Sequence, residues 1–118
     1  MMTTLKGRVF EAQRFVLKDK DGNIRAEWGV EDNNAAVLAL MDKNGARRAE
    51  LSVEADGPAA LALKDQDGRP FASLALKGGQ PSLLLYDRQG KVRAVLNVDE
   101  APSLEFRSPT GALLKRFP

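Results

Sequence analysis

The stretch LLLYDRQGKVRAVLNV, from Leu83 to Val98, decides the fold because it is the clearest copy of a unit that recurs along the chain. Apolar residues alternate with other residues on both sides of the segment DRQG, which begins at Asp87 and ends at Gly90. Alternation with a period of two is typical of a strand that has one apolar face. The stretch therefore predicts two strands joined by a turn.

The same turn segment recurs at a nearly constant spacing. It reads DKDG, DKNG, DQDG and DRQG, and a worn copy, SPTG, ends at Gly111. The five glycines are separated by 23, 23, 22 and 21 residues, which indicates a tandem array of small structural units. The turn residues of the four complete copies are Asp19 and Gly22, Asp42 and Gly45, Asp65 and Gly68, and Asp87 and Gly90. Five tandem hairpins are therefore predicted.

Each turn segment suits a reversal of chain direction. A carboxylate at the first position accepts hydrogen bonds from backbone N–H groups two residues on, and glycine at the last position adopts positive φ without steric cost. A three-residue loop would place Leu17 opposite Arg25 and turn the apolar side of one strand over. We therefore predict four-residue loops, in which Leu17 faces Ile24 and Phe15 faces Ala26.

These units predict an all-β fold in a single domain. About ten short antiparallel strands over residues 15–118 form a meander of tandem hairpins, a curved sheet that is completed by oligomerisation. Residues 1–14 are interpreted as a degenerate half-repeat. Leu5, Val9 and Ala12 there also fit one face of a helix, but Gly7 and the Val9, Phe10 pair favour strand. A β-solenoid, in which equivalent strands stack in parallel, is the alternative architecture.

Composition limits the classes of function. The 118 residues are 43% hydrophobic, enough for one domain with a core. Without His or Cys, the chain has no Ser-His-Asp or Cys-His arrangement, no disulfide and no imidazole or thiolate metal site. The net charge of +2 is too small to indicate nucleic-acid binding. The first residues, MMTTLKGRVF, lack the apolar run of a signal peptide or membrane span, so we expect a cytoplasmic protein without membrane contact.

Carboxylates and arginines remain as residues that could carry chemistry. DKDGN, from Asp19 to Asn23, resembles the start of a calcium loop, but glycine follows the second Asp directly, so a hairpin turn explains the segment better. Arg25, Arg48 and Arg93 recur at one slot and would form a basic column across the sheet. Few aromatic residues accompany this column, so we interpret it as solvated arginines. We predict no metal, no cofactor and no nucleic-acid partner.

The face opposite the alternating apolar residues changes character along the chain. In the first two units it carries charged side chains, whereas in the third and fourth it carries Phe71, Leu84, Tyr86 and Val95. A sheet that is apolar on both faces needs cover on both faces. We therefore predict an interface at these four residues and a homo-oligomer, with another protein as a further candidate partner.

Two repeats carry a resemblance to a known group of proteins. FVLKDKDGNIRAEWGV, from Phe15 to Val30, and SLLLYDRQGKVRAVLNV, from Ser82 to Val98, resemble the repeats of uncharacterised bacterial proteins built from tandem FVLxDxxGxxRAxLxV units. The resemblance extends over nearly the whole chain from Phe15 onward. It implies a hairpin-repeat architecture and implies no activity or catalytic residues. The chain departs from the pattern at Phe71, where arginine is usual, and in the fifth unit.

These observations predict a non-catalytic structural or protein-interaction module rather than an enzyme. The alternative function is a carrier for a small apolar ligand, in which the meander closes into a barrel around a cavity lined by Trp28, Leu51, Leu74 and Leu96. Trp28 occupies a slot that is leucine in three other units, so we interpret it as a core residue at a subunit contact or at the end of the array.

Overall fold

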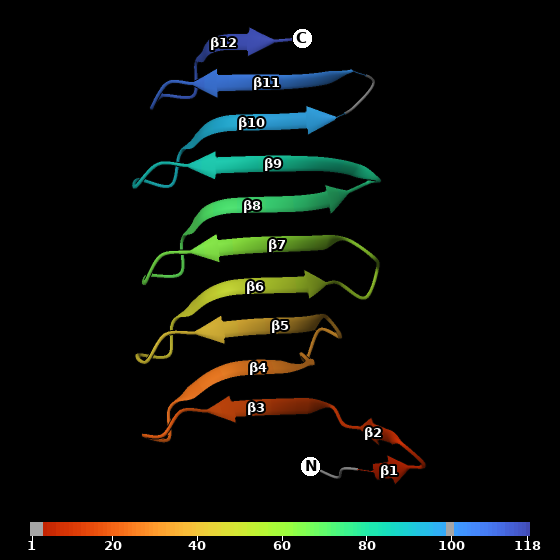
Figure 1. The fold of residues 1–118 in the computed structure, drawn as a ribbon. Helices are drawn as coiled ribbons and strands as arrows, with labels where there is room; N and C mark the ends of the chain where they lie inside the picture. The colour runs from red at the N-terminus through yellow and green to blue at the C-terminus, as the bar shows by residue number, and fades with distance from the viewer. Residues whose placement is uncertain (1–3, 99–100) are drawn as a thin grey trace.

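The computed structural model describes residues 4–98 and 101–118, with the backbone alone described for residues 4–6 and Lys77. Ten strands form one antiparallel sheet in which every strand lies beside its neighbours in sequence (Figure 1). The strands are β3 (Arg14–Lys18), β4 (Ile24–Val30), β5 (Ala36–Met41), β6 (Arg47–Val53), β7 (Ala59–Lys64), β8 (Pro70–Lys77), β9 (Gln80–Tyr86), β10 (Val92–Val98), β11 (Pro102–Arg107) and β12 (Leu113–Phe117). The predicted all-β antiparallel meander is confirmed.

The sheet is open, with β3 at one edge and β12 at the other (Figure 1). Closure into a barrel is therefore wrong for the single chain, and the cavity predicted between Trp28, Leu51, Leu74 and Leu96 does not form within it. The solenoid alternative is also wrong, because consecutive strands pair antiparallel instead of stacking in parallel. No helix in the described part of the chain has the length and apolar character needed to cross a bilayer.

A short hairpin precedes the sheet. Its strands are β1 (Thr4–Lys6) and β2 (Val9–Glu11), which pair only with each other. Gly7 lies between them with a φ of 57°. Strands therefore occupy the segment for which a helix was the competing interpretation. Residues 1–3 of the predicted half-repeat lie outside the described residues.

Each hairpin of the large sheet turns at an Asp-to-Gly segment or at its SPTG copy. The N–H of Gly22 donates to the carbonyl of Asp19 at 3.1 Å, and the N–H of Asp19 donates to the carbonyl of Asn23 at 2.9 Å. The same pair of bonds recurs in the other four turns. The five closing glycines have φ values between 82° and 91°, a left-handed conformation that other residues rarely adopt.

The predicted pairing of the strands is wrong by two residues on β4. Leu17 lies opposite Ala26 and Phe15 lies opposite Trp28, whereas Ile24 lies opposite Lys18 on the other face. The loop between Asp19 and Asn23 has three residues, and an irregularity in β4 at Arg25 takes up one further residue. Such a β-bulge restores the alternation that a three-residue loop alone would reverse. The same shift occurs at the equivalent position of all five hairpins.

Candidate interaction surface

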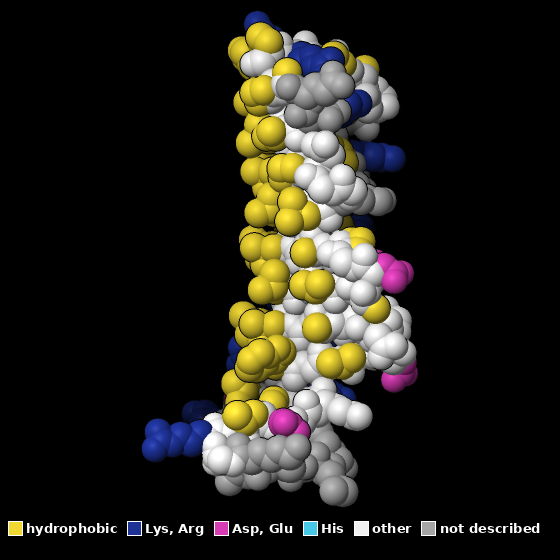
Figure 2. Space-filling view, turned by 90° about the vertical axis from the view of Figure 1, so that its right-hand side faces the viewer, with side chains coloured by type: hydrophobic (Ala, Val, Ile, Leu, Met, Phe, Trp, Pro, Cys, Tyr) yellow, Lys and Arg dark blue, Asp and Glu magenta, His cyan; other side chains and the backbone are white. Residues whose placement is uncertain are grey.

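One face of the ten-stranded sheet is apolar from edge to edge, and we call it the apolar face. Strand pairing arranges its residues in three rows that cross the sheet. The central row contains only large side chains: Phe15, Trp28, Leu38, Leu51, Leu61, Leu74, Leu83, Leu96, Leu104 and Phe117. Figure 2 shows this face edge-on as a yellow column that runs along most of the molecule.

The row nearest the five turns, the turn row, alternates between large and small side chains. First strands of the hairpins contribute the large residues Leu17, Leu40, Leu63, Leu85 and Phe106, and second strands contribute Ala26, Ala49, Ala72 and Ala94 between them. Lys115 ends the row and is the one charged side chain among the described members of the apolar face. Its Nζ lies 5.4 Å from the centre of the Phe117 ring.

The row at the opposite ends of the strands, the far row, alternates in the reverse sense. Here second strands contribute the large residues Val30, Val53, Leu76 and Val98. First strands contribute the small or compact residues Ala36, Ala59, Pro81 and Pro102. On every strand from β4 to β11, a large residue in one outer row therefore accompanies a small one in the other.

The apolar face is uncovered in the single chain. Its large side chains, Leu104 excepted, are between 36% and 67% exposed, and Leu17 and Trp28 are the most exposed among them. Among the described residues, no large side chain is fully buried. The rings of Phe15 and Trp28 lie beside each other near the β3 edge, with centroids 6.4 Å apart. The residues expected to form the core therefore face outward.

The overall dimensions reflect this bare face. The chain exposes 8930 Å², whereas a compact protein of its mass exposes about 6,300 Å². Its radius of gyration is 17.8 Å, against about 13 to 14 Å for a compact chain of this length. The excess of about 2,600 Å² is more than the roughly 800 Å² that each partner buries in an interface of standard size.

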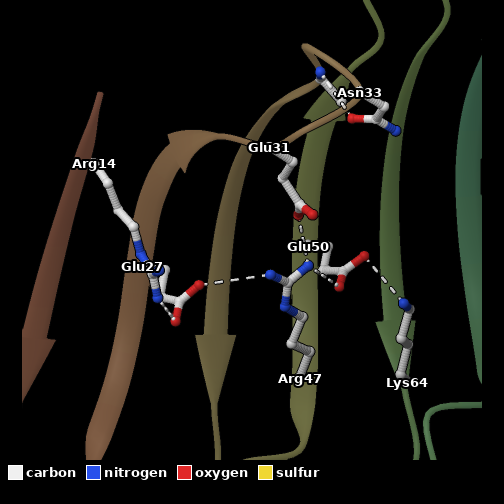
Figure 3. A network of polar contacts seen from close by, with 8 residues as sticks. Arg14, Glu27, Glu31, Asn33, Arg47, Glu50 and Lys64 are labelled. Carbon is white, nitrogen blue, oxygen red and sulfur yellow. Dashed lines mark hydrogen bonds and ion pairs between the residues drawn. The ribbon is translucent and has the colours of Figure 1, made fainter. Parts of the chain in front are cut away.

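Over β3 to β7, long charged side chains cover the reverse face of the same sheet. Figure 3 shows Arg47 at the centre of a network over β3 to β7, with its guanidinium 2.9 Å from Glu31, 3.2 Å from Glu50 and 3.5 Å from Glu27. Arg14 pairs with Glu27 at one end, and Lys64 lies 3.0 Å from Glu50 at the other. The network joins three basic to three acidic groups, so its charges balance.

Small residues lie beneath this network. Ala39 pairs with Glu27 on one side and Glu50 on the other and is 0% exposed. Ala35, Val37 and Met41 complete the cluster of buried residues. Partial burial acts to raise the pKa of Glu50, but the hydrogen bonds and charges of Lys64 and Arg47 outweigh it and hold this pKa below its ordinary value. The stems of long charged side chains thus replace a second layer on this face.

The arginines of the predicted basic column lie at the bulges. The Nε of Arg25 donates to the carbonyl of Met41 at 2.8 Å, and its Nη1 lies 3.7 Å from Asp19 of its own turn. Arg48 and Arg93 repeat the arrangement, with Nε bonds of 2.8 and 2.7 Å to the carbonyls of Lys64 and Arg107. Each arginine therefore joins its own turn to the next hairpin, and the turn carboxylates offset its charge. Sequence reasoning found the column but missed this link.

The turn aspartates act as backbone acceptors. Oδ1 of Asp19 accepts the N–H groups of Asp21 and Asn23, both at 3.0 Å, and Asp42, Asp65 and Asp87 repeat the pattern. The N–H four residues on is the main cause of the lowered pKa of Asp19, Asp65 and Asp87. For Asp42, partial burial opposes the shift, and the N–H groups of Ala46 and Asn44 outweigh it, so its pKa is lowered too.

Three of the four residues of the predicted interface lie on the reverse face, and the fourth lies at a bulge. Leu84 and Val95 are cross-strand partners on the reverse face, where Leu84 is half-buried and Val95 is only 8% exposed. Tyr86 is half-buried, with its hydroxyl 3.5 Å from that of Ser73. Phe71 occupies the bulge of β8, where the other complete repeats have arginine. Leu84 and Val95 line a hollow of about 380 Å³.

The fold and these surfaces define a single-layer antiparallel repeat protein with one bare and one self-covered face. A scan against models of known protein families gives no match for this chain, and no curated protein matches it in sequence. The resemblance to the bacterial FVLxDxxGxxRAxLxV repeats therefore stays a prediction.

Proposed function

We propose that this chain is a non-catalytic structural or protein-interaction module that self-associates through its apolar face. A second copy of the chain covers this face. The uncovered apolar face, continuous over ten strands, carries the proposal. Stable domains bury the apolar face of a sheet against a second layer. In this chain no second layer accompanies the sheet among the described residues, so a second copy supplies it.

The area available supports a second copy over a weak or transient partner. An excess of about 2,600 Å² per chain is comparable to what subunits of obligate homodimers bury, and such interfaces resemble a domain core cut in half. A two-fold dimer uses the same patch on both subunits, so one continuous apolar face is sufficient for it. Two sheets packed face to face at a separation of about 10 Å would form a β-sandwich.

The chemistry of the chain supports a non-catalytic role. The sequence contains no His or Cys. Its most regularly placed carboxylates already accept backbone N–H groups and pair with arginines at the turns. Their pKa values are lowered from an ordinary value at which they are already ionised at neutral pH, and an ionised carboxylate does not suit a general acid.

Two adjacent residues on β7 provide a matched test. Leu61 lies on the apolar face, whereas Ala60 lies on the reverse face between Ser52 and Ala75. We expect the wild type to elute in size-exclusion chromatography with light scattering at no less than twice the 12.9 kDa of the chain. We expect Leu61→Glu to abolish this assembly, because it would bury a carboxylate among leucines, and Ala60→Glu to leave the mass unchanged.

A further variant separates the two faces. Tyr86→Lys should retain the wild-type mass, and loss of assembly in this variant alone would move the interface to the reverse face. Because Leu61→Glu can also unfold the chain, the melting temperature of the wild type is measured over a hundredfold range of protein concentration. Self-association makes that temperature rise with concentration. A monomeric wild type with a concentration-independent melting temperature would overturn the proposal.

A further inference from the structure

The alternating rows of the apolar face specify how a second copy fits. This inference rests on the self-association proposed above and concerns the register of the two sheets. Leu40, Leu63 and Leu85 of the turn row stand two strands apart, at about 9.6 Å, with an alanine between each pair. Ala26 is only 8% exposed, because it lies between Leu17 and Leu40. Large side chains therefore alternate with gaps over the alanines along this row.

A row of alternating large and small residues packs closely only against an opposing surface with the same period. Layers pack to native density when large residues of one meet small residues of the other. The far row has this period too, with its large residues on the strands where the turn row has alanine, as in Leu76 and Ala72 of β8. A flat apolar surface would leave a gap over every alanine.

We propose that two copies interlock face to face, with each large residue of the outer rows over a small residue of the partner. Two arrangements with a two-fold axis between the sheets satisfy this condition. With the hairpins in reverse order, the turn rows face each other, and Leu63 of β7 lies over Ala72 of the other copy's β8. With the hairpins in the same order, the turn row faces the far row, and Ala72 lies over Leu76 of the other copy.

The same alternation of large and small residues excludes other positions of one sheet over the other. A slip of one strand, about 4.8 Å, would place leucine over leucine in the reverse-order arrangement. Overpacking of this kind forces side chains out of their preferred rotamers. The alternation of Leu and Ala therefore fixes the register, while the leucines of the central row supply apolar area at every strand.

Enlarging one alanine of the turn row tests the proposed packing of the two copies. Ala72→Leu places a large side chain where the other copy already has one, so we expect the dimer dissociation constant to rise about tenfold or more. The matched control is Ala75→Leu on the same strand, which lies on the reverse face between Ala60 and Ser82 and should leave dissociation unchanged. Dissociation is measured by sedimentation velocity over a dilution series.

Mixing experiments identify the residue of the other copy that faces position 72. Ala72→Leu protein is mixed with a mass-tagged copy that carries either Leu63→Ala or Leu76→Ala, and native mass spectrometry measures the fraction of mixed dimer. We expect one of the two leucine-to-alanine variants to restore wild-type affinity. This is Leu63→Ala if the hairpins run in reverse order and Leu76→Ala if they run in the same order. An Ala72→Leu dimer as tight as the wild type, or restoration by neither variant, would overturn the interlock. Both results leave self-association itself standing, whereas a monomeric wild type would refute the proposed function.

Discussion

The two faces of the sheet are built from the same strands, yet they differ in how far their apolar residues are shielded from solvent. On the reverse face, Arg47, Glu50 and Lys64 extend over small residues, so Ala39 is fully buried without a second layer. On the apolar face, the large residues point outward, and Ala26 is the one alanine of its described rows that they bury. Long charged side chains can therefore replace a packing layer over small residues, whereas rows of leucine in a single-layer sheet stay exposed.

The largest effect is expected from truncating a leucine of the central row. If a second copy covers Leu38, then Leu38→Ala should lower the free energy of unfolding by about 2–4 kcal/mol, as for other buried leucines. If the apolar face stays bare in solution, the change should be within about 0.5 kcal/mol, as at other exposed positions. Urea denaturation at a fixed protein concentration measures the difference. Leu114→Ala is the control, because this exposed leucine lies at the bulge of the edge strand β12.

Acid should destabilise the fold through the turns, which belong to neither face. The pKa values of Asp42, Asp65 and Asp87 are lowered in the folded chain from an ordinary value of 3.8. A lowered folded pKa contributes stability that is complete above the unfolded pKa and is lost as the pH falls through the folded pKa. We therefore expect the melting temperature to be constant above about pH 5 and to fall progressively below pH 4.

The worn fifth turn indicates how to remove this acid dependence. Ser108 Oγ accepts the N–H groups of Thr110 and Ala112 at 3.3 and 3.1 Å, the same bonds that the aspartates make, and it does not titrate in this range. A chain with Asp42→Ser, Asp65→Ser and Asp87→Ser should lose less melting temperature between pH 5 and pH 2.5 than the wild type. An equal loss in both proteins would place the acid sensitivity elsewhere. Asp56→Ser, in the exposed loop before β7, should behave like the wild type.

The charged network of the reverse face should respond to salt, unlike the apolar face. Arg47→Gln removes the group that joins Glu27, Glu31 and Glu50 and should cost about 1 kcal/mol at low ionic strength. The cost should shrink in 0.5 M sodium chloride, because salt screens exposed ion pairs. The cost of Leu38→Ala should persist there. Thermal unfolding at two salt concentrations measures both, and Arg88→Gln, in an exposed turn, is the control. A salt-independent cost of Arg47→Gln would show that its stem, rather than its charge, protects Ala39.

Alternation and turn chemistry were sufficient to predict five hairpins and one apolar face. They could not predict the pairing, because a four-residue loop and a three-residue loop followed by a bulge place the residues from Ala26 onward on the same face and differ only before the bulge, at Ile24. Leu17 therefore pairs with Ala26 instead of Ile24. The recurring arginine after the glycine was the available signal, since it lies at the bulge and its side chain donates to a carbonyl of the next hairpin.

The candidate surface was harder to predict than the fold. The sequence identified residues that need cover, but it could not distinguish cover within the chain from cover by another copy. Leu84 and Val95 looked like an exposed patch, yet the structure buries Val95 within one chain. Trp28 was interpreted as a core residue, yet it faces outward. Which face remains bare depends on whether neighbouring strands offer long charged side chains, and this depends on pairing that the alternation does not determine.

The smallest effect concerns the repeat that lacks its arginine. In the third hairpin Phe71 occupies the bulge, so Phe71→Arg should restore the missing bond, with Nε donating to the carbonyl of Tyr86 as Arg48 does to that of Lys64. The gain should be about 0.5–1 kcal/mol, the net contribution of one hydrogen bond, and it should lie at the low end because Arg69 already lies 3.3 Å from Asp65. Urea denaturation of Phe71→Arg beside Phe71→Gln separates the bond from the loss of the ring.

Phe71→Arg also distinguishes the two faces as the site of assembly. If Phe71 belongs to an interface with Leu84 and Tyr86, as the sequence predicts, then an arginine there would weaken assembly, and light scattering would report a smaller mass. If assembly uses the apolar face, the mass is unchanged and the chain becomes slightly more stable. The two faces thus predict opposite signs for a single substitution, because the same guanidinium completes a link between hairpins on one hypothesis and disrupts a subunit contact on the other.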